Sequence, residues 1–217
     1  GPFEEGRIVR LGQDEAEKGQ EVEKRGRDRD PGEEGAGKEE PKGLSDEERA
    51  YAGVLAAWAT DERNYASKGP PAEAVEALWK CGDPDSFVDL AFAGSMSDDV
   101  VGNLAGHLLE GSGYRVAVAV VNMLMARVGR LQRAAPRVLV GQVVRAGMMN
   151  GRAVVEGVFN GGLDVGGVVG EVMSKVVREC LTSDLVEVVL EKAARSKWGS
   201  GGVMAVEELV GKCSQDV

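Results

Sequence analysis

The chain has 217 residues, with 26 Lys and Arg against 36 Asp and Glu, which gives a formal net charge of −10. This acidity argues against a general nucleic-acid coat, because such proteins neutralise phosphates with a positive surface. With 43% hydrophobic and 29% charged residues, the chain can bury a core, and its length allows one or two domains. Its longest apolar runs are much shorter than the ~18 residues of a membrane-spanning helix, which predicts a soluble protein without a membrane partner.

Residues 1–44 have the composition of a disordered or extended mixed-charge arm. They contain 13 acidic and 9 basic residues and few large apolar side chains. Burial in such a segment cannot offset the entropy that ordering costs. Its first two residues, Gly1-Pro2, resemble the scar left when a protease removes an affinity tag.

Helix-start signals predict that ordered structure begins at Ser45. Glu48 follows three residues later. This spacing is typical of a capping box, in which the Ser hydroxyl caps the helix and the Glu carboxylate accepts a hydrogen bond from the backbone amide of the Ser. We expect this helix to end before Gly69, because Gly69-Pro70-Pro71 cannot continue it, and Pro71 to be the first residue of the next helix. The same signals predict further helix starts at Asp83, Ser97 and Thr182, and a last helix after Gly199–Gly202.

Valine dominates the second half, with 21 copies between residues 115 and 190. Valine favours strands, and the strict alternation at residues 116–120 leaves a buried strand as the alternative there. Apolar positions in 140–148 and 165–177 recur every three or four residues, which indicates helices. We therefore predict a single all-α domain at residues 45–214, built of nine or ten short antiparallel helices.

Three segments share an apolar-apolar-Gly-polar-apolar pattern: residues 100–104, 139–143 and 168–172. Their offsets of 39 and 29 residues lie around the roughly 34 to 47 residues of known helical repeats, but they are unequal. The sequence leaves two architectures open, a degenerate α-solenoid-like helical repeat and an irregular helical bundle.

Glycine inside a helix costs about 1 kcal/mol relative to alanine, so its presence predicts places where helix backbones pack closely. The expected positions are Gly102, Gly106, Gly141, Gly147, Gly157, Gly166, Gly167 and Gly170. We interpret Met148 and Met149 as filler of the apolar core, with a Met-lined groove for a partner helix as the alternative.

Charge is strongly segregated along the chain. Residues 111–155 contain seven Arg and no Asp, Glu or Lys, whereas residues 45–110 hold 13 acidic and 4 basic residues. The planar guanidinium of Arg can bind a carboxylate or phosphate through two parallel hydrogen bonds. We expect an Arg-rich face at a corner between two helices, formed by Arg127, Arg130, Arg133, Arg137 and Arg145.

Three interpretations of this face compete. The Arg side chains pair with the acidic flanks of the same chain, bind an acidic segment of a protein partner or of the chain's own arm, or bind RNA. The absence of Lys and the scarcity of aromatic residues weigh against RNA. We predict a non-enzymatic interaction or scaffold domain that docks an acidic or amphipathic segment. An RNA-binding helical array and an enzyme whose site is invisible in the sequence are the alternatives, and the oligomeric state is left open.

No catalytic, cofactor or metal motif is recognisable in the sequence. His107 is the single His, which excludes a two-His metal site. The distant Cys81, Cys180 and Cys213 argue against a disulfide framework and for an intracellular, reducing compartment, without separating cytoplasm, nucleus and organelle. The Gly-rich segment 161–170 lacks the strand and the Gly-Lys of nucleotide-binding loops, and predicts a turn into a closely packed helix.

Overall fold

The computed structural model describes residues 43–61, 64 and 69–214, which belong to one compact unit spanning residues 39–217. The described residues form ten helices and no strand: α1 (Asp46–Thr60), α2 (Ala72–Lys80), α3 (Pro84–Ala91), α4 (Asp98–Leu109), α5 (Tyr114–Gly129), α6 (Arg137–Met149), α7 (Gly151–Phe159), α8 (Gly167–Cys180), α9 (Ser183–Arg195) and α10 (Ser200–Cys213). The all-α prediction is confirmed. The predicted arm at residues 1–44 lies almost wholly outside the described residues. None of the helices described is long and apolar enough to cross a membrane.

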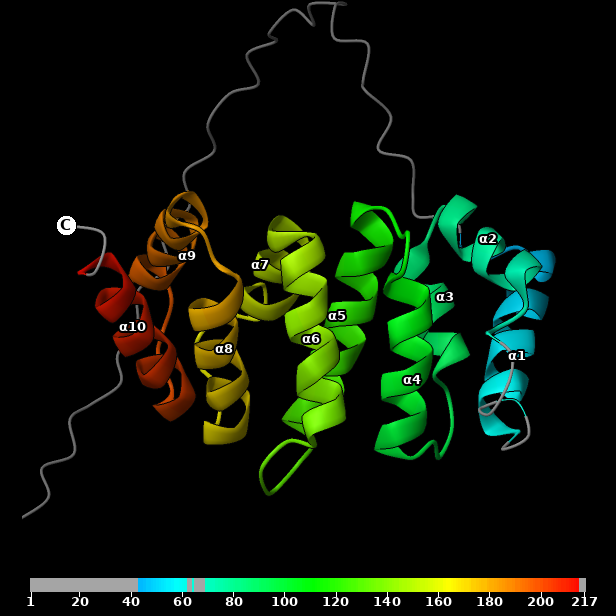
Figure 1. The fold of residues 1–217 in the computed structure, drawn as a ribbon, viewed down its shortest axis with the longest axis horizontal. Coiled ribbons are helices and arrows are strands. Elements are labelled where there is room, and N and C mark those ends of the chain that lie inside the picture. The colour runs from blue at the N-terminus through cyan, green and yellow to red at the C-terminus, as the bar shows by residue number, and fades with distance from the viewer. Residues whose placement is uncertain (1–42, 62–63, 65–68, 215–217) are drawn as a thin grey trace, which may run out of the picture. The chain divides into compact units, whose positions relative to one another are not determined.

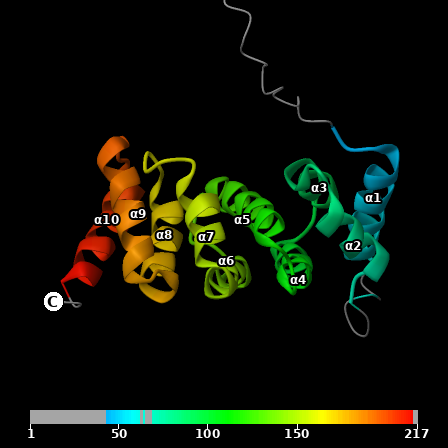
Figure 2. The ribbon, with the colours of Figure 1, turned by 90° about the horizontal axis from the view of Figure 1, so that it is seen from above.

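The helices pack in two layers. Helices α1, α3, α5, α7 and α9 contact one another in sequence, and so do α4, α6, α8 and α10, while α2 packs on α1 and α3. Figure 1 shows α4 and α6 in front, and the view from above separates these two helices from α3 and α5 behind (Figure 2). Helices α5, α7 and α9 also contact members of the layer formed by α4, α6, α8 and α10, so their apolar faces are shared between the two layers.

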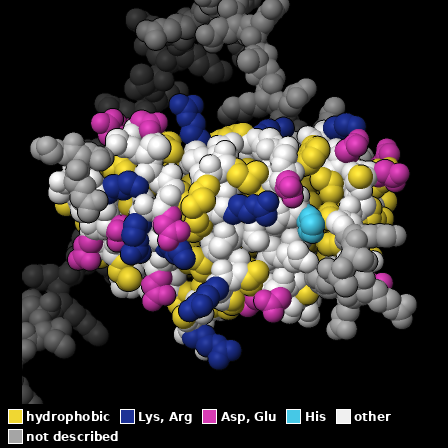
Figure 3. Space-filling model, viewed as in Figure 1, with side chains coloured by type: hydrophobic (Ala, Val, Ile, Leu, Met, Phe, Trp, Pro, Cys, Tyr) yellow, Lys and Arg dark blue, Asp and Glu magenta, His cyan; other side chains and the backbone are white. Residues whose placement is uncertain are grey.

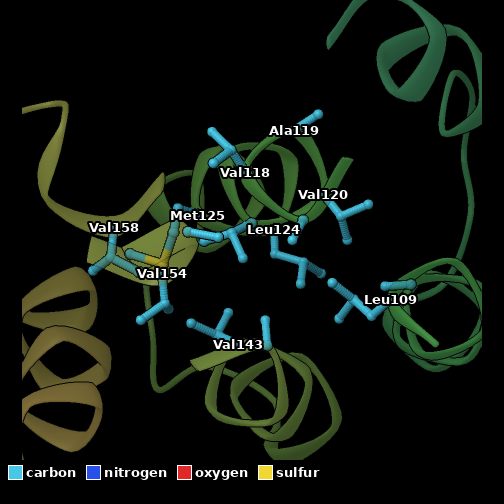
Figure 4. Packing of buried hydrophobic residues seen from close by; sticks show 14 of the residues in the cluster. Leu109, Val118, Ala119, Val120, Leu124, Met125, Val143, Val154 and Val158 are labelled. Atoms are coloured by element: carbon cyan, nitrogen blue, oxygen red, sulfur yellow. The ribbon is translucent and has the colours of Figure 1, made fainter. Parts of the chain in front are cut away.

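Helix α5 lies at the centre of the apolar core, which explains its valine alternation. The residues at 116–121 are all buried, because α4, α6, α7 and α3 surround this helix. Figure 4 shows Leu124 of α5 between Leu109 of α4, Val143 of α6 and the α7 side chains, with Val118 on the opposite side of α5. A helix covered on nearly every side has no polar face, so its composition resembles that of a buried strand. The strand alternative at residues 116–120 is wrong.

Most predicted helix starts are confirmed. The Ser45 hydroxyl accepts a hydrogen bond from the Glu48 backbone amide, and the Glu48 carboxylate accepts one from the Ser45 backbone amide at 2.7 Å. Helix α1, however, ends at Thr60, well before Gly69. The Thr60 hydroxyl donates back to the Ala56 and Ala57 carbonyls, and such local side-chain bonds compete with helix continuation. At the other end of the chain, α10 begins at Ser200, so two glycines expected to precede the helix lie inside it.

Glycines in the helices mark several close helix contacts. A Cβ at Gly102 would overlap Val138 of α6, one at Gly157 would overlap Val121 of α5, and one at Gly147 would overlap Cys180 of α8. At Gly170 and Gly201 the backbones of α8 and α10 touch directly. The prediction is wrong for Gly141 and Gly167, where a Cβ would meet nothing within 4 Å, whereas the Gly166 carbonyl lies close to Gly201 of α10.

The interpretation of Met148 and Met149 as filler of the apolar core is wrong, because these two side chains at the C-terminal end of α6 are 67% and 50% exposed.

The Gly-rich segment 161–170 is a turn into a closely packed helix, as expected. It contains a short backbone pairing with the α9–α10 connection, in which the Gly199 amide donates to the Leu163 carbonyl at 2.8 Å and the Gly201 amide to the Val165 carbonyl at 3.0 Å. Glycines on both sides allow the two backbones to come this close.

The three similar segments fall in α4, α6 and α8, which belong to the same layer. Their glycines do not make equivalent contacts, since Gly102 meets a side chain, Gly170 meets backbone and Gly141 meets open space. The helical repeat therefore stays a prediction.

Candidate functional site: an arginine corner between α5 and α6

The five predicted Arg residues follow the end of α5 and the course of α6. Arg127 lies in the last turn of α5, Arg130 is its C-cap, and Arg133 lies in the connection. Arg137 is the first residue of α6, after the N-cap Pro136, and Arg145 lies two turns further along. The structure brings the first four to one helix–helix corner and places Arg145 away from it.

Arg127 is engaged within the chain. Its Nε donates to Asp98 Oδ1 of α4 at 2.6 Å, and its terminal nitrogen donates to the Met96 carbonyl. Both charged side chains are largely shielded, with exposed fractions of 28% and 29%. Asp98 lies in the first turn of α4, and nothing in the sequence spacing shows that Arg127, 29 residues later, reaches it.

Arg145 also has an internal partner, although a weaker one. Its guanidinium lies 3.8 Å from the Glu110 carboxylate, and the two side chains are 46% and 71% exposed. An ion pair this open to water contributes about 0–1 kcal/mol. Arg127 and Arg145 therefore follow the first interpretation, internal pairing with the acidic flank.

The remaining three residues, Arg130, Arg133 and Arg137, form what we call the arginine corner. All three are exposed, and none of them forms an ion pair with another described residue. Lys and Arg side chains project from the lower edge of the molecule beneath α6, where the α5–α6 connection lies (Figure 3). The corner presents positive charge to solvent.

The two helix ends at this corner have opposite effects, because the N-terminus of α6 adds positive potential and the C-terminus of α5 adds negative potential. Helix α6 has no side-chain cap and no acidic residue in its first turn, and its first residue is Arg137. The partial positive charge of a helix N-terminus disfavours a cation there by about 0.3–1 kcal/mol. Arg130 lies at the opposite kind of end, the negative C-terminus of α5, where a cation is favoured. Arg137 is thus the member of the corner whose position costs stability.

A shallow cavity of about 300 Å³ lies beside the corner. Its lining includes Met123, Arg127 and Arg130 from α5 and its C-cap, and Asp89 and Phe92 from α3 and its C-cap. No ion pair among the described residues joins Asp89 to these Arg side chains. Asp89 thus places an acidic side chain in the same cavity as the two Arg side chains.

The residues considered for catalysis do not assemble in the described part of the chain. His107 packs edge-on against Trp58, with ring centroids 5.8 Å apart, and the described residues show no hydrogen bond from it to Cys or Ser. Burial raises the pKa of Cys81 to about 11, which keeps this thiol protonated at neutral pH. No group of three or more His, Cys, Asp or Glu that could hold a metal is found among the described residues.

No protein-family model, curated protein or solved structure matches the chain.

Proposed function

We propose that the chain is a non-enzymatic interaction domain that binds an acidic segment of a protein partner at the arginine corner. The observation that carries this proposal is the coincidence of three exposed guanidinium groups, none of which pairs with a described carboxylate, with a helix whose first turn contains no acidic residue. A partner carboxylate placed there would accept hydrogen bonds from Arg133 and Arg137 and also offset the repulsion between Arg137 and α6.

The distribution of acidic residues supports a protein ligand over internal pairing at this corner. The chain has no Asp or Glu between residues 111 and 155, so the helices that bear the corner cannot neutralise it themselves. Asp98 of α4 pairs with Arg127 and Glu110, the C-cap of α4, pairs with Arg145, while Asp89 of α3 lines the cavity beside Arg130 but forms no ion pair with a described residue. A local arrangement that costs stability without an internal compensation is typical of a binding site.

The test uses the full chain and a fluorescein-labelled peptide rich in Asp and Glu, with binding followed by fluorescence anisotropy. The double variant Arg133→Glu/Arg137→Glu is expected to weaken binding by at least about tenfold, because two attractions become repulsions. The matched control is Arg195→Glu/Lys197→Glu, which changes the net charge equally at exposed positions on α9 and the connection after it.

If both variants lose the same affinity for the peptide, the loss comes from the change in net charge, and the arginine corner is not the binding site. Mixed single-stranded RNA is titrated in parallel over a range of salt concentrations. Binding of RNA tighter than that of the peptide, with a steep fall as salt rises, would replace the proposal by the RNA-binding alternative.

A further inference from the structure

A cavity of about 680 Å³ lies between α8 and α10. This volume is within the range of small-molecule sites, about 300–1,000 Å³. One face of each helix lines it, and the lining residues are Glu171, Ser174 and Arg178 of α8 and Met204, Glu207, Glu208, Gly211 and Lys212 of α10.

The two helices run in the same direction and contact each other near both ends of this cavity. Near their first turns, the backbone of Gly170 touches that of Gly201. Near their last turns, the Lys212 ammonium donates hydrogen bonds to the carbonyls of Val177 at 3.0 Å and Arg178 at 3.2 Å. The C-termini of both helices therefore lie at the same end of the cavity.

A buried hydroxyl without a partner belongs to the wall of the cavity. Ser174 is only 8% exposed, and its Oγ forms no hydrogen bond with a described residue. Leaving a buried polar group unsatisfied costs free energy, and the great majority of such groups in native proteins have a partner. Ser174 thus offers an unused hydrogen-bonding group to a molecule in the cavity.

Two carboxylates of the cavity are not paired either. Glu171 and Glu207 are exposed, and neither forms an ion pair with a described residue. Lys175 follows Glu171 by one helical turn, but it pairs with Glu179 instead, at 3.8 Å. The cavity therefore contains two negative charges without a counter-charge of their own.

The two cations of the cavity do not balance its negative charge. Arg178 lies 3.7 Å from the third carboxylate, Glu208, and Lys212 binds the carbonyls at the end of α8. Both cations lie in the last turns of their helices, where each helix C-terminus carries a partial negative charge of about half an elementary charge. Three carboxylates and two helix C-termini thus face two cations, and this excess of negative charge selects a cationic ligand.

The contact between Gly170 and Gly201 sets the spacing of the two unpaired carboxylates. Glu171 follows Gly170 by one residue, and Glu207 follows Gly201 by six. Because the helices are parallel, the two carboxylates differ in level by five residues, or about 7.5 Å along the helix axes. Ser174 follows Glu171 by three residues, so it lies between the two levels.

We infer that this cavity binds a linear aliphatic diamine or polyamine. One ammonium group of the ligand pairs with Glu171 and another with Glu207, which the offset of the two carboxylates along the helices separates. The methylene chain between the ammonium groups lies along Met204, and the Ser174 hydroxyl gains its missing hydrogen bond from the ligand. The inference is independent of the proposed function, because the cavity shares no residue with the arginine corner at α5 and α6.

The experiment uses the full chain and isothermal titration calorimetry at low ionic strength, since salt screens exposed charges. The probes are 1,5-diaminopentane and 1-aminopentane, which share the methylene chain and differ by one ammonium group. We expect the diamine to bind about fivefold more tightly, because it forms a second ion pair. The variant Glu171→Gln/Glu207→Gln is expected to weaken the diamine by about tenfold, because both ion pairs are lost.

Two further variants separate the cavity from the acidity of the whole chain. Glu187→Gln/Glu191→Gln changes the net charge equally at exposed positions of α9 and should leave the diamine bound as in the parent chain. Ser174→Ala should weaken the diamine severalfold without lowering Tm, because it removes a buried hydroxyl that has no partner in the protein. Equal affinity for the two amines, an equal loss in the α9 variant, or an unchanged affinity in Ser174→Ala would each overturn the inference.

Discussion

The contact between α8 and α10 gives a sharp prediction about stability. Replacing Gly170 by Ala places a methyl group against the backbone of Gly201, which cannot move without shifting all of α10. Overpacking of this kind lowers the free energy of unfolding by about 1–3 kcal/mol, while the better helix propensity of Ala raises it by about 1 kcal/mol. We place the cost at the upper end, because the overlapping atoms are backbone and because α10 covers buried residues of α8 such as Met173 and Val177.

The matched control is Gly141→Ala. Gly141 occupies the same place in the shared pattern, but a Cβ there would meet nothing within 4 Å, so the substitution should stabilise α6 by about 1 kcal/mol. Urea and thermal unfolding followed by circular dichroism should separate the two variants by about 2–3 kcal/mol, or about 4–12 °C in Tm for a domain of this size. Equal stability of the two variants would refute the close backbone contact.

Three further predictions concern single side chains. Ser45→Ala removes the cap of α1 and should lower the free energy of unfolding by about 1 kcal/mol in urea titrations; an unchanged value would contradict the reciprocal cap. Arg127→Ala should cost about 1 kcal/mol in the same assay, whereas Arg130→Ala should stay within about 0.5 kcal/mol, and the opposite order would contradict the internal pair. Cys81 should react with iodoacetamide far more slowly than the exposed Cys213, since its folded pKa of about 11 exceeds the ordinary 9.0. Its contribution to stability is present below the ordinary pKa and is lost as pH rises through about 11, which pH-dependent unfolding would detect.

Local signals predicted the helices well because their causes are local. Ser45, Asp83 and Ser97 each accept a hydrogen bond from a backbone amide three residues later, an interaction contained within one turn. Thr182 is the N-cap of α9, but its hydroxyl donates to Asp184 instead of capping the backbone, so the boundary is correct and the expected mechanism is not. The sequence placed the end of α1 only before Gly69, because no Gly or Pro between Thr60 and Gly69 marks the earlier end.

The candidate site was predictable only in part. The position of Arg130, Arg133 and Arg137 at a helix corner follows from their spacing around Pro136 and is found in the structure. The internal pair of Arg127 depends on how α4 packs against α5, which the sequence does not encode within a short window. The cavity between α8 and α10 was missed for the same reason, because its walls come from two helices that are not adjacent in sequence.

The two-layer packing has a consequence for how the chain comes apart. The main helix contacts join elements no more than three places apart in sequence, so relative contact order is low and rapid folding is expected. Under a force applied to its ends, such an array yields from its termini inward, because α10 is held mainly by α8 and α9 and its release leaves the packing of α1 to α7 intact. The protein would then lengthen in steps under tension, one or two helices at a time.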